Sequence, residues 1–97
     1  MYLRMRITFA HDKSHGKPHY KVRHPKIDER EIREVFDGAL VVFGRRKSVL
    51  KAIGRTRAGR FLTVVFVRRR PDGVHLITSW PSNQRQILIW HQEMQKS

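Results

Sequence analysis

The chain has 97 residues, no cysteine, and a formal net charge of +13 from 21 Lys/Arg against 8 Asp/Glu. The length allows one domain with a single modest core, and the lack of cysteine excludes disulfides and thiolate chemistry. No apolar run approaches the roughly 18–20 residues of a membrane helix and no signal peptide is visible, so we expect a cytoplasmic protein with an acidic partner.

The first 18 residues are predicted to be a partly flexible strand and loop within a single domain that spans residues 1–97. Alternating polar and apolar side chains over residues 6–10 predict the strand, and a polar stretch with one Gly and one Pro predicts the loop. Residues 19–24 predict a short helical turn, which ends there because Pro25 disfavours helical backbone in the residue before it.

The clearest local signal predicts a helix over residues 28–37. Asp28 is a favourable N-cap, and Glu31 stands three residues later, which is the spacing of a capping box. Ile27 and Ile32 occupy the positions of a hydrophobic staple, in which a residue before the cap packs against the first turn. We therefore expect this helix to bury one apolar face.

Four apolar runs separated by short turns predict an antiparallel meander. They cover residues 40–43, 49–53, 60–67 and 74–78. Strict alternation in the last run places Thr78 on the same face as Leu76, and Ser79 on the same face as His75.

The C-terminal residues predict another helix, with Ser82 as its N-cap. Ile87, Trp90 and Met94 recur at helical spacing and form one apolar side. We expect Trp90, like Phe36 in the first long helix, to be a core residue.

In chain order these elements predict an α+β domain. We expect an antiparallel sheet of four to five strands, with one or two N-terminal helices and a C-terminal helix. Between residues 39 and 71 the chain holds ten Lys/Arg and no Asp or Glu. Helices on one face of a sheet leave the other face free, so these cations predict contact with a polyanion such as RNA.

Four parts of the chain resemble, in the same order, segments of a known protein family. They are Arg23-His24, Glu31–Phe36, the strand-turn-strand Ala52–Leu62, and the last strands Val64–Phe66 and Gly73–Ser79. Together they resemble the BrnT type of toxin within the RelE/ParE-like superfamily. The resemblance implies a RelE-like fold and a toxin of a type II toxin–antitoxin system, a metal-independent endoribonuclease that cleaves RNA and blocks translation without a cofactor. It also implies an acidic, DNA-binding antitoxin from an adjacent gene, which forms a hetero-oligomer with the toxin.

RNA cleavage without a metal needs a base for the 2′-hydroxyl, cations for the phosphate and an acid for the leaving oxygen. His24 matches the histidine of the family, and Arg55 follows Gly54 at a strand end; with Arg85 they are the predicted catalytic residues. The predicted RNA-binding residues are Lys21, Arg23, Arg45, Arg46, Lys47, Arg57, Arg60, His75 and Trp80. Structural roles are the alternatives: a helix cap for His24, a solvated hairpin residue for Arg55 and a plug between sheet and helix for Trp80.

The N-terminal part also holds histidines at intervals of four to five residues, which are His11, His15, His19 and His24. On a continuous helix they would lie on one side, as metal ligands do. Gly16 and Pro18 interrupt such a helix, so no metal site is predicted.

Other functions are compatible with the same residues. A non-catalytic nucleic-acid-binding protein would use the basic sheet only to hold a backbone. A ParE-like toxin would act on gyrase instead of RNA. Where the family commonly carries an Ala-Arg pair after the last strand, this chain has Ser79-Trp80-Pro81, which leaves a degenerate, inactive toxin as a further alternative.

Overall fold

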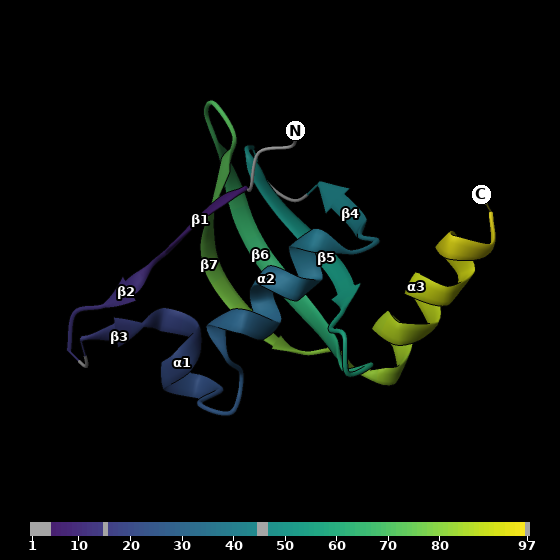
Figure 1. The fold of residues 1–97 in the computed structure, drawn as a ribbon, viewed down its shortest axis with the longest axis horizontal. Coiled ribbons are helices and arrows are strands. Elements are labelled where there is room, and N and C mark those ends of the chain that lie inside the picture. The colour runs from purple at the N-terminus through teal and green to yellow at the C-terminus, as the bar shows by residue number, and fades with distance from the viewer. Residues whose placement is uncertain (1–4, 15, 45–46, 97) are drawn as a thin grey trace.

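The computed structural model describes residues 5–14, 16–44 and 47–96. Its centre is an open five-stranded sheet in the order β1-β7-β6-β5-β4, with a separate two-stranded ribbon near the N-terminus (Figure 1). The five strands are β1 Arg6–Phe9, β4 Val41–Gly44, β5 Val49–Arg55, β6 Phe61–Arg69 and β7 Gly73–Pro81. With three helices, this confirms the predicted α+β class and a sheet of five strands.

The prediction of a wholly antiparallel sheet is wrong at one edge. Strands β4 to β7 pair antiparallel, as their short turns require, but β1 pairs parallel with β7. Two parallel strands cannot be joined by a tight turn, and the chain between β1 and β7 is long, since it includes the ribbon, two helices and the strands β4 to β6. The first strand therefore adds to the last one and extends the meander.

Helix α2 (Glu29–Asp37) forms as its local signals predict. The backbone N–H of Asp28 donates to Glu31 Oε1 over 3.0 Å within the capping box. Ile27 and Ile32 are fully buried, in keeping with the predicted staple. Phe36 is also buried and packs edge-on against Phe66, with ring centroids 5.1 Å apart.

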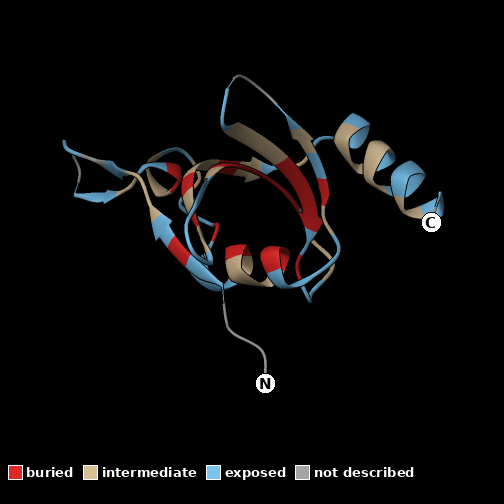
Figure 2. Cartoon of the chain, turned by 90° about the horizontal axis from the view of Figure 1, so that it is seen from above, coloured by how far each residue is buried: buried red, intermediate tan, exposed pale blue. Residues whose placement is uncertain are grey.

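We call the face of the sheet that α2 covers the inner face, and the opposite one the outer face. The core lies between the inner face and α2, and Figure 2 shows the buried residues gathered there. Gly54 permits this close packing, because a Cβ at its position would lie 2.6 Å from Val35 Cγ1 and 2.8 Å from Leu40 Cδ2. Any side chain at residue 54 would push α2 away from β5.

Helix α1 (His19–Arg23) follows a small hairpin that was predicted as loop, formed by β2 (His11–Asp12) and β3 (Lys17–Pro18). Tyr20 anchors α1, because this residue is buried and its ring packs against that of Phe9, with the ring centroids 5.8 Å apart. Burial raises the pKa of the Tyr20 phenol, and the nearby acidic residues of the α2 N-terminus raise it further. Of the segment predicted to be flexible, residues 1–4 and 15 lie outside the described residues.

Helix α3 (Gln84–Gln95) differs from its prediction in its cap and its packing. Asn83 is the N-cap, accepting from the Gln86 N–H over 2.8 Å, whereas the Ser82 hydroxyl lies 2.8 Å from Thr63 Oγ1. No residue of α3 is buried, so the prediction that Trp90 belongs to the core is wrong (Figure 2). Helix α3 runs beside the sheet rather than over it. The Trp90 ring therefore packs edge-on against Phe61, and its Nε1 donates to the Ala39 carbonyl.

No helix among the described residues is long and apolar enough to cross a membrane.

Candidate functional site

A bulge in β7 decides which of its side chains reach the outer face. Val65 of β6 pairs with Thr78 and Phe66 pairs with Leu76, so Ile77 is an extra residue without a partner on β6. Paired residues share a face, which puts Thr78 on the outer face with Val65 and turns Ser79 inward. The alternation predicted from the sequence is therefore wrong beyond Leu76.

The end of β7 and helix α1 enclose a hollow of about 500 Å³, which we call the histidine cleft. It is lined by His19, Arg23, His24, Thr78, Trp80 and Pro81. Helix α1 can pack here because β1 pairs with β7 only as far as Leu76, which leaves the rest of that edge open. Three residues predicted from the sequence, His24, Arg23 and Trp80, thus line one cleft.

His24 stands on a backbone that is held from both sides. Its N–H donates to the Tyr20 carbonyl over 2.9 Å, and its carbonyl accepts from the Ile27 N–H over 3.1 Å. Since Tyr20 and Ile27 are both buried, these two bonds hold the His24 backbone against the core and so fix the position from which its side chain extends. The residue is half-buried, so its ring is partly shielded while still lining the cleft.

His19 and Thr78 line the same cleft but were not predicted as active-site residues. His19 was considered only as a metal ligand. The spacing of four residues between His19 and Arg23 places both on one side of α1, a signal that the sequence did contain. Thr78 could not be found by alternation, because the bulge at Ile77 reverses its face.

The other two predicted catalytic arginines do not line the histidine cleft. The Arg55 guanidinium, at the end of β5, lies over the Phe61 ring with its carbon 5.7 Å from the ring centroid. It also faces Gly59, where a Cβ would come within 3.3 Å of Arg55 Nη2. Arg85 is exposed in the first turn of α3 and lines a separate hollow with Leu88.

Two of the predicted RNA-binding cations are engaged within the protein. Lys21 Nζ donates to the Pro25 carbonyl over 2.8 Å and lies 3.6 Å from Asp28 Oδ1. Arg60 Nη1 lies 3.3 Å from Glu31 Oε1, so this side chain ties the β5–β6 hairpin to α2. These contacts favour a structural role for both residues.

The remaining predicted RNA-binding residues are spread over the surface. Arg57 and Lys47 are exposed, and the backbone N–H of Arg57 donates to Glu34 Oε1. His75 is half-buried on the outer face of β7, where its Nδ1 lies 2.7 Å from the Thr8 hydroxyl of β1. Arg45 and Arg46 lie outside the described residues.

The candidate histidines for a metal that the structure describes, His11, His19 and His24, belong to no metal-binding group. Among residues 5–14, 16–44 and 47–96, no group of three or more His, Cys, Asp or Glu could hold a metal ion. His15, one of the four considered, lies outside this part of the chain.

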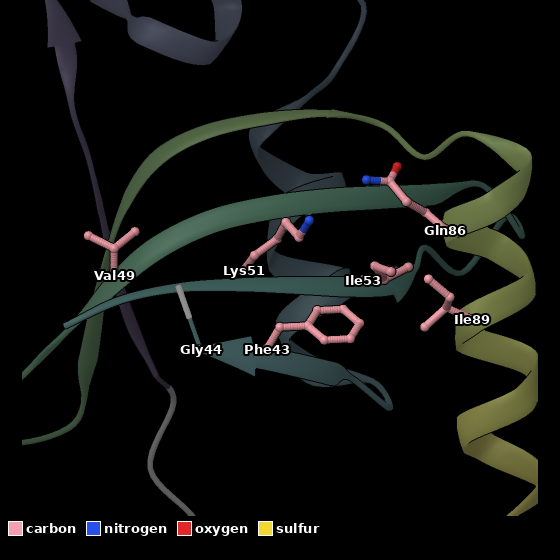
Figure 3. Close-up of a pocket in the computed structure, with 7 residues that line it drawn as sticks. All are labelled: Phe43, Gly44, Val49, Lys51, Ile53, Gln86 and Ile89. Atoms are coloured by element: carbon pink, nitrogen blue, oxygen red, sulfur yellow. The ribbon is translucent and has the colours of Figure 1, made fainter. Parts of the chain in front are cut away.

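A second concave surface lies between α3 and the strands β4 and β5, and we call it the α3 groove (Figure 3). Its volume is about 710 Å³, and it is lined by Phe43, Gly44, Val49, Lys51, Ile53, Gln86 and Ile89. Figure 3 shows Ile89 of α3 facing Ile53 of β5. Lys51 is the one ionisable residue of this lining, and its ammonium lies 5.7 Å from the centroid of the Phe43 ring.

No family model matches the chain, and neither do any curated protein or any solved structure. Its function must therefore be argued from the residues of the histidine cleft and from the distribution of charge.

Proposed function

We propose that this protein is a metal-independent endoribonuclease, the toxin of a type II toxin–antitoxin system, with a fold of the RelE-like kind and an arrangement of the BrnT type. The observation that carries the proposal is the meeting of two histidines, an arginine and a tryptophan in one cleft. Histidine is the side chain best suited to both accept and donate a proton near neutral pH. Arginine supplies a fixed charge for phosphate and tryptophan a surface on which a base stacks.

The cleft supports cleavage by internal transfer of the phosphate. One histidine takes the proton of the 2′-hydroxyl, and the 2′-oxygen forms a bond to the adjacent phosphorus. Arg23 stabilises the additional negative charge of the crowded phosphate. The bond from phosphorus to the 5′-oxygen then breaks, and the other histidine gives that oxygen its proton. The products are a 2′,3′-cyclic phosphate and a 5′-hydroxyl, and no metal or cofactor takes part.

The test of this function uses the purified protein, a single-stranded RNA and an excess of EDTA. We expect cleavage that leaves 2′,3′-cyclic phosphate ends, because the attacking group belongs to the RNA. DNA of the same sequence is the matched control and should stay intact, since it lacks the 2′-hydroxyl. RNA that binds but stays intact would contradict the enzyme and favour the non-catalytic nucleic-acid-binding protein.

The proposed toxin has an acidic partner, a DNA-binding antitoxin encoded by an adjacent gene, and both act in the cytoplasm as a hetero-oligomer. The net charge of +13 favours a partner of opposite charge. We place an apolar segment of this antitoxin in the α3 groove, with one of its carboxylates at Lys51. No carboxylate among the described residues forms an ion pair with that ammonium.

Thermal melting of the toxin with its antitoxin tests this contact. A partner present at 100 times its dissociation constant should stabilise the toxin by about 2.7 kcal/mol, because it binds only the folded state. Ile89→Asp would put a charge into the apolar groove and should remove most of this gain. Leu88→Asp is the control, since Leu88 is 56% exposed and lies outside the groove lining. An unchanged melting temperature in wild type would contradict the partner, and equal losses in both variants would contradict its position.

A further inference from the structure

Four arginines gather where β1 meets the turn between β6 and β7. They are Arg6, Arg68, Arg69 and Arg70, which we call the arginine cluster, and all four are exposed. Arg6, Thr8, Arg69 and Arg70 border one hollow of about 250 Å³, and Arg68 borders an adjoining one of about 410 Å³. The proposed cleavage step does not use any of these arginines.

The acidic side chains that form ion pairs in the described part of the chain compensate cations away from this cluster. Four carboxylates at or within α2 form ion pairs with Lys21, Arg30, Arg33 and Arg60, and Glu93 pairs with Lys96. Among the described residues, no arginine of the cluster takes part in an ion pair. Asp72 is the single acidic side chain at these hollows. The cluster therefore presents four guanidinium groups against one carboxylate, an arrangement that a bound anion would stabilise.

The strand register links this cluster to the histidine cleft. Arg6 and Arg69 both pair with Gly73, and Thr8 pairs with His75 two residues further along β7. Arg68 pairs instead with Val74, a core residue, so its side chain starts on the inner face. Beyond the bulge, Thr78 and Trp80 continue on the same outer face and line the cleft. Figure 1 shows the β6–β7 turn and helix α1 at opposite ends of β7. Polar and cationic groups thus follow the strand from one site to the other.

We propose that the outer face of β7 is a binding track for single-stranded RNA, with upstream or downstream phosphates held at Arg6, Arg69 and Arg70 of the arginine cluster while the cleaved bond lies in the histidine cleft. This inference rests on the proposed function. Guanidinium groups bind phosphate oxygens through paired hydrogen bonds, which suits them to this backbone. Strand β7 has nine residues, so the track is about 26 Å long at roughly 3.3 Å per residue. That length accommodates about eight nucleotides of a stacked strand at roughly 3.4 Å per phosphate.

Binding of RNA with 2′-O-methyl groups, which cannot be cleaved by internal transfer, tests the track. Dissociation constants would be measured for oligonucleotides of four, eight and twelve nucleotides over a range of salt concentrations. Wild type should gain affinity from four to about eight nucleotides and little beyond, because the track is then filled. The variant Arg6→Gln/Arg69→Gln/Arg70→Gln should lose this gain, because it removes the cluster arginines of the outer face and of the turn. The fall of log affinity with log salt should also become shallower by about 2 in its slope, at roughly 0.7 for each phosphate that the protein no longer neutralises.

The control Arg30→Gln/Arg33→Gln/Lys96→Gln removes the same charge from side chains that form ion pairs in α2 and at the C-terminal end of α3. Its length dependence and salt slope should match those of wild type. Equal changes in both variants, or none in the first, would overturn the track. Cleavage of a four-nucleotide RNA separates the two proposals. If both variants cleave this RNA at the wild-type rate and their salt slopes are equal, only the track fails. If length-dependent binding persists in a protein that cleaves no RNA, only the nuclease fails.

Discussion

RNA cleavage by the His24→Ala protein should be slower than cleavage by wild type by about 10²- to 10⁴-fold, the usual contribution of one general acid or base. The His19→Ala protein should show a loss of the same order, because the reaction needs one histidine to remove a proton and another to return one. The rates are to be compared at saturating RNA, so that weaker binding does not count as slower chemistry.

Arg55→Ala distinguishes the active site proposed from the structure from the one predicted from the sequence. The sequence places Arg55 beside His24 among the catalytic residues, whereas in the structure its guanidinium lies over Phe61, apart from the cleft lining. We therefore expect Arg55→Ala to retain a cleavage rate within about tenfold of wild type, far from the loss caused by one missing acid or base. Equal losses for Arg55→Ala and His24→Ala would contradict the histidine cleft as the active site and restore the predicted one.

A fold check must accompany the His24 variant. Only the backbone of His24 is hydrogen-bonded to the core residues Tyr20 and Ile27, and alanine preserves that backbone. The melting temperature of His24→Ala should therefore stay close to that of wild type. A large drop would support the alternative reading of His24 as a structural residue at the end of α1.

Local signals explain why much of the fold could be predicted. The cap of α2 is decided by Asp28 and Glu31, which are three residues apart, and the strands β5 to β7 by β-branched runs that end at turns. What failed depends on contacts between distant residues. The parallel pairing of β1 with β7 joins Arg6 to Gly73, and no pattern within either strand encodes it.

The bulge at Ile77 shows the same limit at the site. It arises where β7 pairs with β6, and it moves Thr78 to the outer face and Ser79 to the inner face. Alternation within one strand cannot reveal an extra residue relative to the neighbouring strand. His24, Arg23 and Trp80 could each be selected from their chemistry, but their meeting in one cleft depends on how α1 packs on the free edge of β7.

The packing of the two long helices predicts losses of stability of very different size for the same substitution. Ile32 of α2 is fully buried between the inner face of the sheet and its own helix. Ile32→Ala should lower the free energy of unfolding by about 2–5 kcal/mol, because it removes buried methyl groups and leaves a cavity. For a domain of this size, each kcal/mol corresponds to roughly 4–8 °C in melting temperature. Urea unfolding would measure the loss as a lower midpoint concentration, with an unchanged slope of the unfolding free energy against urea.

Ile87→Ala in α3 is the matched control, since the same atoms are removed from a half-exposed side chain of a helix without buried residues. Its cost should stay below about 1 kcal/mol, because much of the side chain remains in water in both states and no closed cavity forms. If Ile87→Ala cost as much as Ile32→Ala, α3 would have to pack into the core, which would contradict the packing of this helix described above. Unequal costs would instead leave α3 as a helix whose apolar side chains are available to a partner, with little effect on the stability of the domain.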